Sequence, residues 1–158
     1  MNDMHRKAER VQARLVELGA AGTVRELDDS TRSAPEAAAA VSADVAQIAK
    51  SLVFVAGAEP LLVIASGANR VDLEKVAAHV GAPVTGVDAK TVKQLTGFAA
   101  GGVPPVAHDQ PLRVLIDRDL LGHAEIWAAA GTPRALFPTT PDELTRITGG
   151  EVVDVRQS

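Results

Sequence analysis

The sequence predicts a single α/β domain over residues 1–158, in which helices surround a curved, mixed and mostly antiparallel sheet of about seven strands. Short apolar segments of strand length alternate with segments whose apolar residues recur at helical period. Several neighbouring strand segments are joined by links too short for a crossover helix, which favours antiparallel pairing. The length of 158 residues and the 46% hydrophobic content are those of one globular domain with its own core.

The predicted strands are short apolar segments bounded by glycine, proline or polar residues. They occupy residues 23–28, 50–57, 60–67, 83–88, 112–117, 125–131, 134–139 and 151–155. The segments 50–57 and 60–67 are so close in the chain that we expect them to form a β-hairpin.

The predicted helices begin at capping residues, and most of them end at glycines. Residues 4–18 carry apolar side chains every three or four positions, which predicts an amphipathic helix ending at Gly19. Ser33 and Glu36 form a capping box at the start of an alanine-rich helix. The remaining helical segments are a short turn at 44–47 and helices over 72–80, 88–96 and 140–148.

Composition excludes several classes of protein. The chain has no cysteine, which excludes disulfides, thiolate metal sites and a cysteine nucleophile. It has no segment of signal-peptide type and no apolar run long enough to span a membrane, so we expect a cytoplasmic protein. The net charge of −4 argues against a protein that coats nucleic acid nonspecifically. The histidines lack ligand spacing, and residues 117–119 (Asp-Arg-Asp) are interpreted as a solvated turn, so no metal or cofactor is expected.

Lys50 stands at the start of an apolar strand whose two faces both look buried. Alternation places Lys50 on one face with Leu52 and Phe54, and Ser51 on the other. A lysine in such a run is costly unless it meets an anion or a polar partner. The pattern leaves two interpretations open, a strand-end lysine that reaches water and a functional cation.

Residues 96–108, TGFAAGGVPPVAH, combine three glycines with two adjacent prolines. This segment is either a tight connection between a helix and a strand or a ligand-binding loop. In the second interpretation the glycines let a ligand approach the backbone N–H groups, and the prolines stiffen the exit. Such donors suit the oxyanion of an acyl-transfer reaction.

Arg6, Arg10 and Arg14 are spaced by four residues and form a basic stripe on the first helix. The stripe is interpreted either as the solvated face of an amphipathic helix or as a surface that contacts phosphates. Spacing does not separate these two interpretations.

Five segments then occur in a recognisable order: QIAKSLVF (47–54), LLVIASGANRVDLEKVAAHVG (61–81), LTGFAAGGVPP (95–105), LIDRDLL (115–121) and PDELTRITGGEVVDV (141–155). In order and spacing they resemble the YbaK/prolyl-tRNA-synthetase-associated editing domain family. The resemblance is strongest over residues 30–155. Its most specific parts are the Ala-Lys-Ser-Leu strand entry and the Thr-Gly-Phe…Gly-Gly-Val…Pro loop.

The resemblance implies a trans-acting aminoacyl-tRNA deacylase that hydrolyses the ester of a mischarged tRNA without a covalent protein nucleophile. It implies aminoacyl-tRNA, recognised at its CCA end, as the partner, with an aminoacyl-tRNA synthetase as a further one. The family's essential lysine falls on Lys50, and its catalytic backbone donors fall on Gly101 and Gly102 in the loop that ends at Pro105. The implied substrate-binding residues are Ser51, Val103, Pro104, Pro105, Phe98 and Arg134.

The chain departs from many relatives at a few of these positions. Pro104 and Val106 stand where a serine and a phenylalanine are common, and Arg134 lies near the position of a histidine in some members. We expect changes at the loop exit to alter the pocket wall and the amino-acid specificity. They leave open a second function, a non-catalytic module that binds aminoacyl-adenosine or tRNA. A third, a scaffold for protein interaction, leaves Lys50 without a role.

Overall fold

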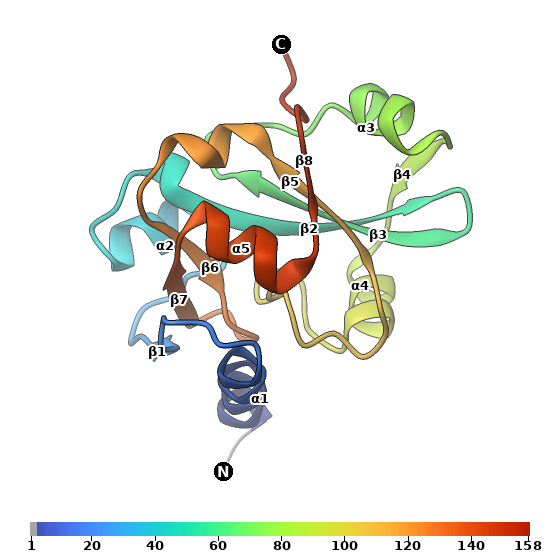
Figure 1. Ribbon diagram of the computed structural model, residues 1–158. Coiled ribbons are helices and arrows are strands. Elements are labelled where there is room, and N and C mark those ends of the chain that lie inside the picture. Colours follow the sequence, from blue (N-terminus) through green and yellow to red (C-terminus); the bar gives the residue numbers. More distant parts are fainter. Residues whose placement is uncertain (1–2) are drawn as a thin grey trace.

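A mixed sheet of eight strands organises the computed structural model, which describes residues 3–158 (Figure 1). The strands are β1 (Arg25–Glu26), β2 (Ile48–Ala56), β3 (Glu59–Ser66), β4 (Val84–Gly86), β5 (Arg113–Asp117), β6 (Ile126–Ala129), β7 (Ala135–Thr139) and β8 (Glu151–Val153). The helices are α1 (Asp3–Glu17), α2 (Ala34–Ala40), α3 (Leu73–Val80), α4 (Ala89–Thr96) and α5 (Pro141–Thr148), with 3-10 turns η1 (Val45–Gln47) and η2 (Arg118–Gly122).

Seven strands follow the order β1-β7-β6-β2-β3-β5-β8, and β4 pairs with β2 off this path. Within the described part of the chain, four pairings are antiparallel and three are parallel. The predicted mixed α/β fold is therefore confirmed, although antiparallel pairs outnumber parallel pairs by one. The expected hairpin is β2–β3, in which Lys50 lies opposite Ala65.

Strand β2 changes its neighbour on the edge that faces away from β3. Ile48 and Ala49 pair with β6 in parallel, whereas Phe54 to Ala56 pair with β4 in antiparallel. Residues 50–53 lie between these two pairings and have no strand neighbour on this edge among the described residues. The sheet is therefore open beside Lys50, inside an element that is otherwise central.

Helices cover both faces of the sheet. Leu62 and Ile64 of β3 pack into the largest apolar cluster, which α1, α5 and the loop after α4 complete. Leu61 and Val63 alternate with them and pack on the other face, against α3. On that same face α2 covers Ile48 of β2. In Figure 1, α5 crosses the near face of the sheet and α1 lies below it.

The predicted helix boundaries are confirmed by capping hydrogen bonds. The side chains of Ser33, Asp72, Asp88 and Thr140 each accept a hydrogen bond from a backbone N–H of the first helical turn. Gly81, Gly97 and Gly149 follow three of the helices in the left-handed conformation, which a residue with a side chain rarely adopts. No described helix combines the length and the apolar content that crossing a membrane requires.

The interpretation of residues 117–119 as a solvated turn is wrong. Asp117 is 1% exposed and caps η2 by accepting a hydrogen bond from the Asp119 N–H at 2.9 Å. Its other carboxylate oxygen accepts a hydrogen bond from the Ser66 N–H at 3.0 Å. The sequence showed a short charged run, but the carboxylate is buried because partners remote in the chain satisfy it.

Ile64 tests the core of the sheet because its side chain is fully buried on β3. We expect Ile64→Ala to lower the free energy of unfolding by about 2–5 kcal/mol, because it removes buried methyl groups and leaves a cavity. Val16→Ala is the control, since Val16 is 66% exposed and should change stability by less than about 0.5 kcal/mol. Urea denaturation measures both values, and equal losses would contradict the described core.

Candidate functional site

A cavity of about 220 Å³ lies at the open edge of β2. Its walls come from the segment before α2, from α2, β2, β6 and β7, and from the glycine-rich loop. Lys50 and Ser51 are neighbours in a strand and point to opposite faces of the sheet, yet both line this cavity. They can do so because the missing strand neighbour leaves the sheet open between its two faces.

The Lys50 ammonium is held by a network that begins at the buried Asp117. Lys50 Nζ donates a hydrogen bond to the backbone carbonyl of Asn69 at 2.7 Å. The Asn69 side-chain amide donates to Asp117 Oδ2 at 2.9 Å and to Asp119 Oδ2 at 2.8 Å. Asp117 and Asp119 thus fix the turn after β3 through Asn69. The Asn69 carbonyl in turn fixes the position of the Lys50 ammonium.

The environment of Lys50 changes its protonation. Burial lowers the pKa of Lys50 below the usual value, the Asp117 carboxylate raises it in part, and the Arg70 guanidinium lowers it further. Arg70 lines a hollow of about 320 Å³ that adjoins the cavity and shares Lys50 with it. Leu52 and Phe54 line this hollow as well, which agrees with the predicted strand face.

Two hydroxyl groups of the cavity wall have no partner among the described residues, Thr31 Oγ1 and Ser51 Oγ. Thr31 is 3% exposed. A buried hydroxyl without a hydrogen bond costs about 1–3 kcal/mol, and such groups cluster where a ligand or an ordered water completes the site. These two groups are therefore candidates for contact with a polar ligand in the cavity.

The glycine-rich loop reaches the cavity through Gly101 and Val103. Gly101 has φ +88, and a Cβ there would meet the Arg32 side chain at 2.6 Å. A Cβ at Gly102 would meet the backbone of Thr132 at 2.9 Å, so the loop and the β6–β7 turn approach too closely for a side chain. These two glycines are required by backbone geometry and by close packing.

The backbone amides of the loop differ in their availability. The Gly102 N–H donates to the Ala99 carbonyl at 3.0 Å, and the Gly102 carbonyl accepts from the Gly131 N–H at 2.9 Å. Gly102 is therefore engaged within the loop in this conformation. The N–H groups of Gly101 and Val103 have no hydrogen-bond acceptor in the described part of the chain. Gly101 and Val103 are consequently the free donors on this side of the cavity.

The structure brings together four of the predicted site residues, Lys50, Ser51, Gly101 and Val103. Gly102 lies behind them against Thr132. The other four do not line this cavity: Phe98 is fully buried, Pro104 and Pro105 are buried, and Arg134 donates to the Asp28 carbonyl at 2.8 Å. The loop exit therefore packs away from the cavity wall, contrary to the expectation that Pro104 and Val106 alter that wall.

Several lining residues had no signal in the sequence, among them Thr31, Ala37, Ala129 and Leu136. They come from segments that are distant in the chain, and the topology of the sheet alone brings them beside β2. Ile48 and Ala49 could have been included, since they precede Lys50 on the same strand.

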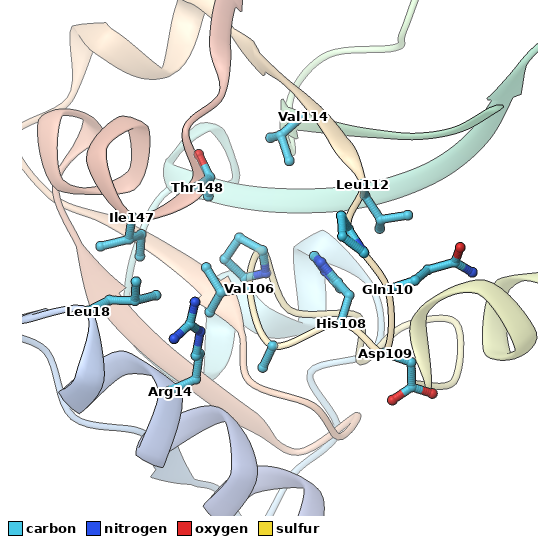
Figure 2. A pocket seen from close by; sticks show the side chains of 13 residues that line it. Arg14, Leu18, Val106, His108, Asp109, Gln110, Leu112, Val114, Ile147 and Thr148 are labelled. Carbon is cyan, nitrogen blue, oxygen red and sulfur yellow. The ribbon is translucent and has the colours of Figure 1, made fainter.

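A larger hollow of about 380 Å³ lies on the other side of the loop exit (Figure 2). Figure 2 shows Arg14 of α1, Ile147 of α5 and Val106 of the loop around it. Its polar groups are bound within the protein: His108 Nε2 to the Pro104 carbonyl at 2.7 Å, and Thr148 Oγ1 to the Leu144 carbonyl at 2.7 Å. Burial also lowers the pKa of His108. The cavity at Lys50 is the better candidate because two hydroxyl groups of its wall remain unpaired among the described residues.

Among the described residues, no three histidine, aspartate or glutamate side chains come together in a way that could hold a metal ion. The cavity beside Lys50 therefore offers a half-buried cation, two unpaired hydroxyls and two free amides within an apolar wall. This set of groups can bind an anionic or carbonyl-bearing molecule of small size.

Fold and site together define a mixed α/β domain with a small cavity at the open edge of its sheet. The chain belongs to the family of aminoacyl-tRNA editing domains, whose model matches residues 28–147. This confirms the resemblance found in the sequence.

Individual relatives agree with the family. The chain is 51% identical to a proposed trans-editing enzyme for prolyl tRNA synthetase, with a TM-score of 0.92 over 96% of this chain and 98% of that one. It is 30% identical to the hypothetical protein APE2540, with a TM-score of 0.88 over 94% and 99% of the two chains. It is also 29% identical to the uncharacterized protein YwhH of Bacillus subtilis (strain 168), over 84% of this chain and 85% of that one.

The titration of Lys50 tests the electrostatics of the site. We expect Lys50 to titrate below the usual pKa of a lysine, and Arg70→Gln to raise the pKa of Lys50 because a nearby cation is removed. Carbon-13 NMR of the lysine Cε groups against pH measures both values. Arg113→Gln is the control, since Arg113 lies opposite Leu61, at the other end of β3 from Ala65. A Lys50 pKa at the usual value for lysine would contradict the described burial.

Thr31→Val tests the unpaired hydroxyl. Valine keeps the shape of threonine and removes a buried donor without a partner, so we expect the free energy of unfolding to stay the same or to rise by about 1 kcal/mol. Urea denaturation measures the change. Thr96→Val is the matched control, because Thr96 Oγ1 donates to the Val92 carbonyl at 2.8 Å and should lose stability when replaced. A loss at Thr31 as large as that at Thr96 would show that Thr31 has a partner.

Proposed function

We propose that the chain is a trans-acting deacylase that hydrolyses the ester bond of a mischarged aminoacyl-tRNA. The observation that carries this proposal is the meeting of Lys50 with the free amides of Gly101 and Val103 in one small cavity. Family membership supplies the substrate class, and the geometry supports a role for each group. The aminoacyl group and the terminal ribose are expected to enter at the open edge of β2.

Hydrolysis in this cavity needs little machinery. Water attacks the carbonyl carbon of the ester, the carbonyl oxygen takes up negative charge, and the bond to the ribose oxygen then breaks. The ribose oxygen takes a proton, and the amino acid leaves as a carboxylate. The amides of Gly101 and Val103 are the proposed donors to the oxyanion, and removal of one such donor typically costs about 10²–10³ in rate.

A covalent protein nucleophile has no support at this site. Ser51 is the hydroxyl nearest to Lys50 in the strand, and no histidine lines the cavity to act as its base. Water, held by the cavity or by the substrate's own groups, is therefore the proposed nucleophile. The unpaired hydroxyls of Thr31 and Ser51 are proposed to contact the aminoacyl group.

Lys50 is proposed to act by its charge. Its Nζ already donates to the Asn69 carbonyl, which leaves two further N–H groups for the substrate. Arg70 lies in the adjoining hollow, so the two cations are proposed to bind the phosphates at the CCA end of the tRNA. The overall charge of −4 suits such local contacts better than a broad RNA-binding surface.

The partner proposed first is a prolyl-tRNA synthetase. The structural relative with 51% identity is described as a proposed trans-editing enzyme for that synthetase. The chain would then clear tRNA that this synthetase has charged with a wrong amino acid. The alternative function is a module that binds aminoacyl-adenosine in the same cavity without turnover. The deacylation assay described next distinguishes it from the deacylase.

The experiment is a deacylation assay with a panel of charged tRNAs that includes alanyl-, seryl-, threonyl- and cysteinyl-tRNA. We expect at least one to lose its amino acid faster than in buffer, and Lys50→Ala to lower that rate by about 100-fold or more, since the cation that positions the substrate is lost. Arg113→Ala, which removes a cation at the far end of β3, should retain the rate.

Two results would contradict the proposal. If no charged tRNA is hydrolysed faster than in buffer while a non-hydrolysable aminoacyl-adenosine still binds, the chain is a binding module. If Lys50→Ala deacylates as fast as the unchanged protein, the role given to Lys50 is wrong.

A further inference from the structure

We propose that Arg10 and Lys7 of α1 are positioning residues, which hold the glycine-rich loop so that its free amides face the cavity. The inference rests on the proposed function for its effect on rate. Helix α1 lies outside residues 28–147, the part of the chain that the family model matches. It nevertheless makes direct side-chain hydrogen bonds with the loop.

The two side chains bind both ends of the loop. Lys7 Nζ donates to the carbonyl of Gly97, where the loop leaves α4. Arg10 Nη2 donates to the carbonyl of Ala107 at 2.6 Å and to Asp109 Oδ1 at 2.8 Å, where the loop ends. The base of the loop is closed by the Asp109 N–H, which donates to the Thr96 carbonyl at 3.1 Å.

The same two cations cover the aromatic ring of the loop. Lys7 Nζ lies 5.2 Å and Arg10 Cζ lies 5.0 Å from the centre of the Phe98 ring, which is fully buried. Cations at this distance from a ring face are attracted by it. Phe98 thus anchors the start of the loop to α1, and it does not line the cavity beside Lys50.

The backbone of α1 also reaches the middle of the loop through Gly131. A Cβ at Gly131 would meet the carbonyl oxygen of Lys7 at 3.0 Å and Val11 Cγ2 at 3.1 Å, so helix and turn are in close contact. The Gly131 N–H in turn donates to the Gly102 carbonyl at 2.9 Å. Gly102 lies between the two residues whose amides are free, Gly101 and Val103.

Ala107 shows that the loop is held against a local preference. It has φ +72, a conformation that residues other than glycine rarely adopt. The carbonyl of this same residue accepts the hydrogen bond from Arg10. Arg10 Nη2 therefore holds both the residue with unfavourable backbone geometry and the nearby carboxylate of Asp109.

This assignment divides the predicted basic stripe. Arg10 is bound to the loop, whereas Arg6 is exposed. Arg14 is half exposed, and its Nη1 lies 3.9 Å from Glu17 Oε1 of the same helix. Arg14 lies one turn after Arg10 on the same face, so it is the matched control. If the stripe served to bind phosphates, Arg10 and Arg14 would contribute alike.

The test compares Arg10→Ala, Arg10→Lys and Arg14→Ala by kcat and KM, on the charged tRNA that the unchanged protein hydrolyses fastest. Hydrogen–deuterium exchange of residues 97–109 is measured in parallel. We expect Arg10→Ala to lower kcat by about 10-fold with KM within about twofold, because misplaced donors fail in the transition state. Exchange should rise in residues 97–109 and stay unchanged in β3. Arg10→Lys should recover part of kcat, and Arg14→Ala should match the unchanged protein.

Other outcomes overturn the inference. Unchanged kcat and exchange in Arg10→Ala show that the loop needs no clamp. A rise in KM shared by Arg10→Ala and Arg14→Ala, growing with salt, shows a phosphate-binding stripe. A rise in exchange over the whole chain, with no recovery by Arg10→Lys, shows a purely structural residue. If the unchanged protein hydrolyses no charged tRNA, the proposed function fails, and the exchange measurement by itself decides whether Arg10 holds the loop.

Discussion

The candidate site depends on one feature of the sheet, the point at which β2 exchanges β6 for β4 as its neighbour. A central strand normally separates the two faces of a sheet, so its consecutive side chains cannot share a cavity. Here residues 50–53 have no strand neighbour on one edge within the described chain, and Lys50 and Ser51 line the same space. The opening also lets the glycine-rich loop bring backbone amides to that edge. A continuous sheet with the same residues would hold Lys50 and the loop apart.

A second, buried constraint keeps the opening in a fixed shape. Asp117 ends β5 and accepts hydrogen bonds from the Ser66 and Asp119 backbone and from the Asn69 side chain. Asn69 then holds Lys50 through its carbonyl. A buried carboxylate is stable when such donors satisfy it, and each donor here belongs to an element that must be placed correctly. The charge on Asp117 also offsets part of the effect of burial on the pKa of Lys50. One carboxylate thus serves the fold and the electrostatics of the site.

The sequence predicted what local chemistry determines. Capping side chains and glycines marked the helices, and alternation marked β2, because these signals act over a few residues. It also identified Lys50 and Gly101, whose residue types are unusual for their surroundings. The open edge of β2 was not predictable, since its pairing with β6 joins segments nearly eighty residues apart, from Ala49 to Ala128. The burial of Asp117 and the position of Thr31 in the cavity wall were not predictable for the same reason, since both depend on segments distant in the chain. The resemblance assigned Phe98 to the substrate; in the structure its ring packs under Lys7 and Arg10.

The glycine-rich loop shows how binding and folding roles divide within thirteen residues. The N–H groups of Gly101 and Val103 have no acceptor among the described residues. Between them, the Gly102 N–H donates to the Ala99 carbonyl, and the Gly102 carbonyl accepts from the Gly131 N–H. The prolines lie on the far side, where Pro105 and Val106 line the hollow beside α1 and α5. Pro105 and Val106 therefore bear first on how the loop packs against those helices. An ester is labile enough that two well-placed donors and a nearby cation give useful catalysis, provided that they do not move. In the proposed mechanism the loop must keep its shape, and contacts from outside the motif act on both of its ends, through Lys7 and Arg10 of α1.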